Sequence, residues 1–368
     1  MIIAGKEFRH LRHDRFTLIL VLFLPIAQLI FYGYAMETRF RNLPIALVNL
    51  DSHAGGRILE RRISESPLFV IDGSVRTEQE IAAALRRGDI RAGIEIPANF
   101  TAGVLERKDT PIRVWVDGAD VPTSNYLLAA LDALSMRMTI ERISSGPEVR
   151  IQPVVYFNPA GRTAAFLVPG LIAILVQMIC TLLVALSFAV EREKGTLERL
   201  LVTRIGVRAI IGGKALAACV VGALESLVLI LLMRWLFDIP VSGSVLLLIA
   251  AIPLLVLAPV GAGLVIAIKA RTQSQAMQLA QIAFLPSVLL SGFVLPREFL
   301  NEPFGLAGDL IPTTYLVTLV RGIILRGASA GDLAQPILVA AGFGVGLSLL
   351  GYFGLRRSLR RCYTWRLK

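Results

Sequence analysis

The sequence is poor in cysteine, which limits how the chain can be held together. It has three cysteines in 368 residues: Cys180 and Cys219 lie in apolar runs, and Cys362 lies in a basic tail. None falls within residues 37–158, so no disulfide framework is expected to stabilise that part of the chain.

Histidine is equally scarce, and this argues against a metal site. Of the three histidines, His10 and His13 lie three residues apart in an arginine-rich amphipathic stretch, and His53 stands alone. No cysteine–histidine cluster has metal-ligand spacing, so no metal is predicted. We find no Ser/His/Asp or paired-carboxylate constellation either, which argues against an intramembrane enzyme.

A loop that could cradle a nucleotide phosphate is also missing. Such a loop reads Gly-x4-Gly-Lys-Ser/Thr. The nearest match, Gly213-Lys214, is followed by Ala215, and Arg208 stands where the first glycine is needed. The sequence therefore excludes an ATP site of this kind, and no cofactor is predicted for this chain itself.

What the sequence has in abundance is apolar length. Hydrophobic residues make up 55% of the chain, charged residues only 18%, and the mean hydropathy is +0.67. The net charge is +11, but residues 37–150 carry 15 basic and 16 acidic side chains. The positive excess therefore flanks the apolar runs, which indicates membrane topology and not a nucleic-acid surface.

The apolar runs predict a polytopic α-helical membrane protein with six transmembrane helices. About 20 apolar residues span a bilayer, and the predicted spans are residues 16–36, 162–190, 209–236, 245–268, 275–295 and 333–355. Residues 1–15 form an amphipathic basic helix suited to membrane lipid headgroups. Predicted cytoplasmic segments carry seventeen Lys and Arg and the short outer ones four, which predicts that both termini are cytoplasmic. The expected location is a plasma membrane, that is, a bacterial inner membrane.

Residues 37–158 predict an inserted extracytoplasmic α/β domain, because strand-like and helix-like runs alternate there. Thr77 and Glu80 form a capping-box pattern at a helix start, and Gly88 suits its end. The expected strands are 44–50, 68–75, 90–97 and 112–118, and the expected helices are 55–65, 77–87, 99–107 and 125–142.

The chain is organised around a charged run between the second and third predicted spans, residues 191–204. A glycine-threonine pair interrupts this run, with Thr196 as a candidate N-cap, and Leu197, Leu200 and Leu201 then share one helical face. This pattern predicts a short amphipathic helix at the cytoplasmic surface. We call residues 191–204 the coupling segment, for the reason that follows.

The order Glu-x-Glu-x-Gly-Thr-Leu-Glu-x-Leu resembles the loop after the second membrane helix of ABC-2-type export permeases. The resemblance implies that this segment is a coupling helix docking on a separate ATPase subunit, which would bind the ATP and Mg²⁺. It further implies a pair of permeases, identical or paralogous, and leaves room for a periplasmic adaptor. The residues expected to couple to the ATPase are Glu191, Glu193, Gly195, Thr196 and Glu198.

An outer segment, residues 297–327, also resembles this family. It is too apolar for a simple loop, but Arg321 and Arg326 make a full span unfavourable, so we expect a re-entrant or interfacial helix. The Pro-x-x-Tyr element of Pro312 and Tyr315, followed by Arg321, resembles the outer re-entrant segment of the family. The predicted organisation is 1–36, amphipathic helix and first span; 37–158, external domain; and 159–368, five further spans.

Polar residues inside the predicted spans mark candidate functional positions. Glu225 lies near the middle of the third span, where an ionised acid costs roughly 2.5 kcal/mol or more. It is either a functional acid or a hydrogen-bonded structural one. Gln177, Gln278 and Gln281 are candidate partners for it, or they line a polar path. Gly342-x-x-x-Gly346 predicts close helix packing.

Together these observations predict the permease subunit of an ATP-driven exporter of a hydrophobic or amphipathic substrate, such as a drug or lipid. Two alternatives remain open. An ion- or proton-coupled secondary transporter would use Glu225, although we find no inverted repeat. A membrane receptor would use the external domain to bind a ligand, although the inner segments are too short for a signalling domain.

Overall fold

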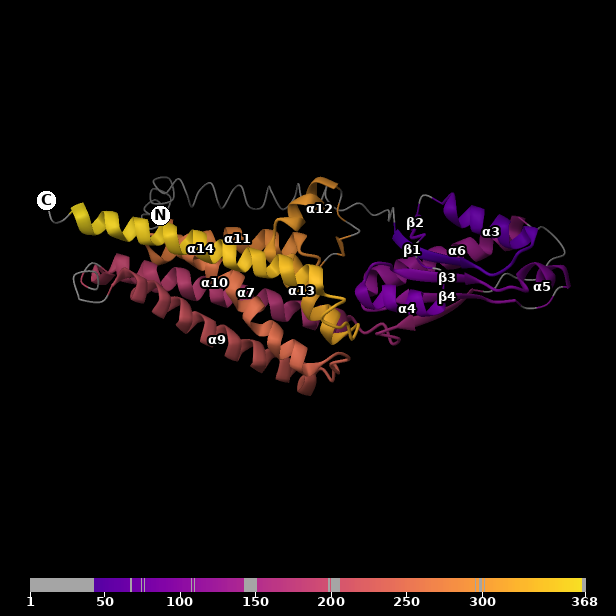
Figure 1. Cartoon of the computed structure of the whole chain (residues 1–368), viewed down its shortest axis with the longest axis horizontal. Helices are drawn as coiled ribbons and strands as arrows, with labels where there is room; N and C mark the ends of the chain where they lie inside the picture. The colour runs from indigo at the N-terminus through magenta and orange to yellow at the C-terminus, as the bar shows by residue number, and fades with distance from the viewer. Residues whose placement is uncertain are drawn as a thin grey trace, which may run out of the picture.

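The computed structural model describes residues 43–141 and 151–365, except for residues 67, 74, 76, 107, 109, 198, 200–205, 295, 298, 299 and 301. The predicted amphipathic helix and first span, residues 1–36, lie outside the described residues. The described chain forms an α/β domain and an elongated helical bundle, arranged end to end (Figure 1).

The α/β domain is built on one five-stranded sheet with the strand order β2-β1-β3-β4-β5. Strands β1, β2 and β3 run parallel, β4 runs antiparallel to β3, and β5 runs parallel to β4. The strands are β1 (Leu43–Asn49), β2 (Phe69–Ile71), β3 (Ala92–Ile96), β4 (Ile112–Asp117) and β5 (Ile151–Tyr156).

Helices cover both faces of this sheet, so the domain has three layers. Alternate residues of a strand point to opposite faces: Ile45 belongs to a core shared with Leu59, and Ala46 to a core shared with Ile81. The first core involves α3 (Ala54–Ser64), α5 (Phe100–Glu106) and α6 (Val121–Glu141), and the second involves α4 (Glu78–Arg87).

Local sequence signals predicted most of this domain. The capping box is confirmed, since the Thr77 side chain accepts from the Glu80 backbone and the Glu80 side chain accepts from the Thr77 backbone. Gly88 ends α4 in the left-handed region at φ 80°, where glycine has no Cβ penalty. Strand β2 is shorter than predicted, α6 begins earlier, and β5 was not predicted.

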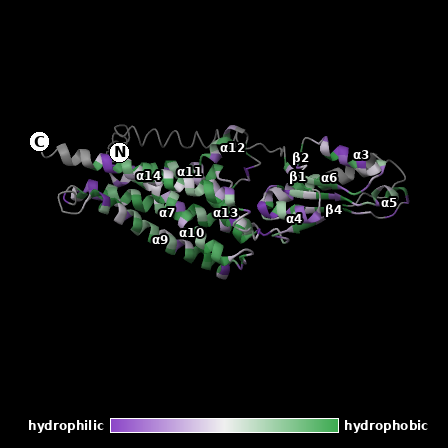
Figure 2. Ribbon diagram, viewed as in Figure 1, coloured by the Kyte–Doolittle hydropathy of each residue, from purple (hydrophilic) through white to green (hydrophobic). Residues whose placement is uncertain are grey.

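The bundle contains the long apolar helices, and its mostly green, hydrophobic ribbon contrasts with the mixed purple and green ribbon of the α/β domain (Figure 2). Its helices are α7 (Thr163–Glu193), α9 (Val207–Leu236), α10 (Val245–Lys269), α11 (Gln273–Leu290), α12 (Glu302–Asp309), α13 (Pro312–Ile324) and α14 (Ala334–Trp365).

Four helices of the described chain are long and apolar enough to cross a membrane: α7, α9, α10 and α14. A fifth candidate is the pair α12–α13, which bends by 79° at a short break. Six spans are therefore not established by length and composition. The first predicted span lies outside the described residues, and α11, the predicted fifth span, is shortened and diluted by glutamines in its first half.

Helix α10 lies at the centre of the bundle and contacts both α7 and α14. A Cβ on Gly351 would lie 2.4 Å from the Leu264 Cβ, so this glycine permits close approach of α14 to α10. Gly342 and Gly346 allow no such approach within the described chain, because a Cβ on either would meet nothing within 4 Å among the described atoms.

A short connection joins the two bodies. Between β5 and α7, the Asn158 side chain accepts a hydrogen bond from the Arg162 N–H and donates one to the Arg162 carbonyl. The Arg162 guanidinium in turn donates to the Phe237 carbonyl at the end of α9. The side chains of this connection therefore link the segment after the last strand to the start of α7 and the end of α9.

Candidate functional site

The chain turns sharply where α7 ends, at the start of the predicted coupling segment. Gly195 has φ 67°, a conformation that costs other residues roughly 1–2 kcal/mol. Its N–H donates to the Arg192 carbonyl. Thr196, the candidate N-cap, instead donates its hydroxyl to the Glu191 carbonyl at 3.3 Å, and Leu197 is buried. Glu198 lies outside the described residues.

Glu191, in the last turn of α7, pairs with Lys214 on α9. The Lys214 ammonium lies 2.8 Å from Glu191 Oε1 and donates to the Ser187 carbonyl at 2.7 Å. It also lies over the Phe188 ring, 5.0 Å from its centroid. Both charged side chains are mostly buried, with 18% and 24% of their areas exposed, so water screens this pair less than a surface pair.

Arg192, the next residue, binds the C-terminal end of α10. Its guanidinium donates hydrogen bonds to the carbonyls of Ala267 and Ala270, the second at 2.7 Å. Carbonyls in the last turn of a helix have no partner within the helix and carry its negative dipole end. A cation at this position therefore satisfies both their hydrogen bonding and their charge.

Glu193, the third residue, binds the N-terminal end of α11. Its carboxylate accepts a 2.9 Å hydrogen bond from the Gln273 N–H. The N-cap Thr272 bonds to a different N–H group, that of Gln275, so the Gln273 N–H is available to Glu193. The first N–H groups of a helix are its positive end, so a carboxylate suits this position. We call Glu191, Arg192 and Glu193 together the Glu-Arg-Glu clamp, because they contact three different helices.

The structure thus brings Glu191, Glu193, Gly195 and Thr196 together at one end of the bundle. Two of the three carboxylates expected to contact the ATPase, Glu191 and Glu193, have partners within the chain. Sequence reasoning missed the two cations that bind here. Arg192 contributed only to the count of cytoplasmic charges, and Lys214 appeared only in the incomplete match to a phosphate-binding loop.

Gln177 bonds to two other helices and not to Glu225. Gln177 on α7 donates a 2.7 Å hydrogen bond to the Ser287 hydroxyl on α11, and its carbonyl accepts from the Thr313 hydroxyl on α13. Gln278 is half-buried on α11. Glu225 lies on α9, and one of its carboxylate oxygens is buried without a hydrogen-bond partner among the described residues.

Gln177 and Gln281 line a cavity of about 180 Å³ between α7, α10 and α11. Its other walls are mainly apolar and include Met178, Met277 and Phe284. Methionine side chains adapt to differently shaped partners. The cavity is close in size to one of about 150 Å³ that accepts benzene, so it can hold one ring or a short chain.

The outer segment forms the bent pair α12–α13. Pro312 occupies the first turn of α13, the Tyr315 hydroxyl donates to the Asp309 carbonyl at 3.0 Å, and the Tyr315 ring stacks on Phe343 of α14. The Pro-x-x-Tyr element therefore shapes the bend, because it starts one helix and fastens it to the end of the other.

Arg321 joins α13 to two other helices. Its guanidinium donates to the carbonyls of Phe166, Gly292 and Phe293, at 3.1, 2.7 and 2.8 Å, and lies 4.0 Å from the centre of the Phe166 ring. The start of α7, the end of α11 and α13 therefore meet at one point, at the opposite end of the bundle from the Glu-Arg-Glu clamp.

Two aspartates anchor the α/β domain. Asp117 on β4 accepts from Arg91 at 3.1 Å and from Arg326 at 2.7 Å. Burial raises the pKa of the Asp117 carboxyl, but the two guanidinium groups outweigh burial and hold the pKa below its usual value. Because Arg326 follows α13, this pair joins the sheet to the bundle.

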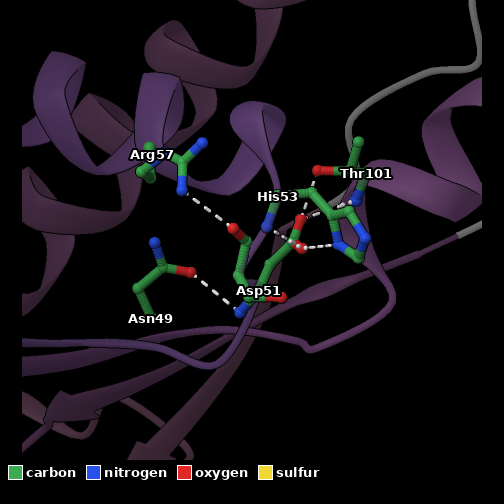
Figure 3. A network of polar contacts seen from close by, with 6 residues as sticks. Asn49, Asp51, His53, Arg57 and Thr101 are labelled. Atoms are coloured by element: carbon green, nitrogen blue, oxygen red, sulfur yellow. Dashed lines mark hydrogen bonds and ion pairs between the residues drawn. The ribbon is translucent and has the colours of Figure 1, made fainter.

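Asp51 lies just beyond β1, where its side chain points toward Thr101 and His53 (Figure 3). Its carboxylate accepts from the N–H and hydroxyl of Thr101 and from the N–H of His53. Burial raises the pKa of Asp51, but these hydrogen bonds outweigh burial and hold the pKa well below its usual value. The carboxylate is thus occupied in holding the starts of α3 and α5. No group of three or more metal-ligating side chains occurs among the described residues.

Comparison with known proteins identifies related chains. A family model described as "ABC-2 family transporter protein" matches residues 15–353. The "Probable multidrug ABC transporter permease YbhS" of Escherichia coli (strain K12) is 28% identical over 331 residues, covering 88% of this chain and 87% of the relative. YbhR, described in the same words and from the same strain, is 26% identical over 329 residues, covering 88% and 89%.

A third relative is the "Inner membrane transport permease YhhJ" of the same strain. It is 28% identical over 334 residues, and the match covers 88% of this chain and 87% of the relative. No solved structure matches the chain.

Proposed function

The chain belongs to the ABC-2 family of transporter proteins and is a permease whose ATPase is a separate subunit; from this premise we propose that it exports a hydrophobic or amphipathic substrate through the cavity beside Gln177. The observation that carries the proposal is that one helix, α7, contributes both to this cavity and to the turn at Gly195. When the ATPase closes, the movement of the coupling segment is transmitted to the cavity wall through α7.

The cavity suits part of such a substrate. Apolar walls with a few placed polar groups are typical of small-molecule sites, and Gln177 and Gln281 supply an amide donor and acceptor. Gln177 lies 16 positions before Glu193, which corresponds to about 24 Å of helix. A tilt imposed at the coupling segment therefore displaces one wall of the cavity. The relatives named as probable multidrug permeases support a substrate of this class.

We further assign six spans, with α11 as the fifth and residues 16–36 as the first. Helix α11 begins beside Glu193, at the end of α7, and finishes beside Phe166, near the start of α7. It therefore runs along α7 and crosses the same thickness. Its 18 residues correspond to about 27 Å, close to the ~30 Å hydrocarbon core.

The same contacts support a re-entrant assignment for α12–α13. The end of α11 contacts Arg321, and Gly322, near the end of α13, packs against Leu333 just before α14. The pair therefore leaves and returns on one side. That side carries the α/β domain. The basic C-terminal tail lies at the opposite end of the bundle, and basic segments stay in the cytoplasm. We therefore place both termini in the cytoplasm and the α/β domain on the outer side of a bacterial inner membrane.

Assembly requires an ATPase at the coupling segment and a second permease, either another copy or a paralogue. Gln281 and Met277 on α11 are exposed, and a polar side chain at membrane depth is stabilised when protein or a water-filled path covers it. The relatives YbhS and YbhR come from one strain, which supports pairing of paralogues. A periplasmic adaptor would meet the outer end of the α/β domain.

The proposal is tested by reconstituting the chain with its ATPase in liposomes and measuring ATP-dependent transport of neutral and cationic fluorescent aromatic compounds. We expect Gln177→Leu and Phe284→Ala to raise the KM for transported compounds. Loss of one hydrogen bond, about 1 kcal/mol, corresponds to about a fivefold rise.

Leu216→Ala is the matched control, because Leu216 is 65% exposed on α9 and away from the cavity. It should leave the KM unchanged. The proposal fails if no compound is transported in an ATP-dependent way, or if the cavity variants behave like the control.

A further inference from the structure

The inner end of the bundle has a feature that a docking loop alone does not require. Three consecutive residues, Glu191, Arg192 and Glu193, contact α9, α10 and α11 respectively. Each contact matches charge with its partner: a carboxylate with an ammonium, a guanidinium with the carbonyl end of a helix, and a carboxylate with the N–H end of a helix.

We propose that the Glu-Arg-Glu clamp is a positioning device that passes movement of the coupling segment to α9, α10 and α11 together. The inference rests on the proposed function, since it presupposes that an ATPase moves this segment. Without the clamp, the segment is linked through the chain only to α7 and α9, its covalent neighbours. With it, α10 and α11, which form two walls of the cavity, are held to the same point.

Arg192 is the central residue of this device. It donates to the carbonyls of Ala267 and Ala270 together, and both lie at the turn that leads into α11. Glu193 holds the other side of that turn through the Gln273 N–H. The α10–α11 turn is therefore gripped on both sides, and its position relative to the end of α7 is fixed.

One nitrogen of the planar guanidinium, Nη1, makes both bonds, and the rigid group fixes its position. Lysine retains the charge but is a flexible point donor, and glutamine retains one donor group without charge. If Arg192 positions the α10–α11 turn, the number of substrate molecules transported per ATP hydrolysed should fall in the order Arg, Lys, Gln.

A purely stabilising contact would instead lower the amount of folded protein without changing that ratio. The ratio is therefore the decisive measurement for Arg192→Lys and Arg192→Gln in liposomes that contain the ATPase. We expect ATP hydrolysis and ATPase association to persist while the ratio falls at least severalfold. An unchanged ratio would overturn the inference.

The Glu191–Lys214 pair permits a sharper test. Glu191→Lys and Lys214→Glu each bring like charges together across a mostly buried contact, and each should lower the ratio. The double variant restores opposite charges, and it should recover most of the ratio. If Glu191 contacted the ATPase and not Lys214, the double variant would remain as defective as Glu191→Lys.

The matched control is the Arg234–Asp238 pair, an exposed contact near the other end of α9. Exchanging these two residues should leave the ratio unchanged. Loss of ATPase co-purification in the clamp variants would also overturn the inference, because the residues would then be docking contacts. If the wild-type chain shows no ATP-dependent transport, the proposed function fails, and this outcome is distinct from clamp variants that keep the wild-type ratio.

Discussion

Arg326, beyond the end of α13, donates a 2.7 Å hydrogen bond to Asp117 on β4, 209 residues away in the sequence. Only 11% of the arginine side chain and none of the aspartate side chain is exposed. Arg91 supplies a second cation to the same carboxylate oxygen. One carboxylate thus holds the chain just beyond α13 against the sheet.

The first prediction concerns removal of this carboxylate. Asp117→Asn leaves two mostly buried guanidinium groups without a counter-charge, and breaking a buried pair in this way costs roughly 3–5 kcal/mol. Thermal unfolding of the full chain in detergent should show a clear loss of stability. Arg61→Ala removes an exposed pair with Glu65 and should cost no more than about 1 kcal/mol; equal effects of the two variants would contradict the prediction.

A second prediction concerns acid. The folded-state pKa of Asp51 lies below its ordinary value of 3.8, so the ionised carboxylate stabilises the fold above that value. This stabilisation is lost as the pH falls below about 4 toward the folded-state pKa. Thr101→Val removes one donor and should destabilise the domain most at neutral pH.

The measurement is the difference in unfolding temperature between wild type and Thr101→Val from pH 7 to pH 3, which should shrink on acidification. Thr110→Val is the control, because the Thr110 hydroxyl donates to a backbone carbonyl and not to a carboxylate. Its effect should not depend on pH. A Thr101→Val difference that stays constant over the range would refute the assignment.

The third prediction concerns the turn at Gly195. A side chain there would meet nothing within 4 Å, so a substitution acts through the backbone alone. Gly195→Val should disfavour the turn by about 1–2 kcal/mol, and Gly195→Asn by less. ATP-dependent flux, measured at equal protein levels, should therefore be highest in wild type, lower in Gly195→Asn and lowest in Gly195→Val.

Gly213→Ala is a suitable comparison, because Gly213 also has open space around a potential Cβ but lies within helix α9. It should be neutral or slightly stabilising. Equal flux in Gly195→Val and Gly213→Ala would mean that the left-handed turn is not needed for coupling.

The fourth prediction separates the roles of Glu225. It makes no ion pair with any described residue and does not line the cavity beside Gln177. We therefore expect Glu225→Gln to transport at the wild-type rate with the same dependence on pH. Transport that becomes independent of pH in this variant would instead favour proton coupling through Glu225.

The sequence predicted those parts of the structure that depend on neighbours along the chain. Thr77, Glu80 and Gly88 mark the ends of α4 with side chains or backbone only a few residues apart, and the structure has the cap and the turn as predicted. The long apolar helices follow from composition in the same way. The family assignment rested on two segments, residues 191–204 and residues 297–327, and the comparisons confirm it.

The parts that sequence reasoning missed depend on partners far along the chain. Strand β5 contains Pro153, which argues against a strand, and it exists because it pairs in register with β4. Lys214 meets Glu191 only because α7 and α9 lie side by side. For the same reason, Gln177 binds Ser287 and Thr313, and not Glu225.

The connection through Asn158 has a consequence for how the α/β domain behaves. Only residues 157–162 separate β5 from α7. Asn158 bonds to the Tyr156 carbonyl on one side and to Arg162 on the other, so we expect the sheet to rotate together with the helix. A tilt of α7 should therefore change the orientation of the α/β domain by a similar angle. Two dyes, one near Leu105 on α5 and one on the bundle, would report a change in this orientation during the transport cycle.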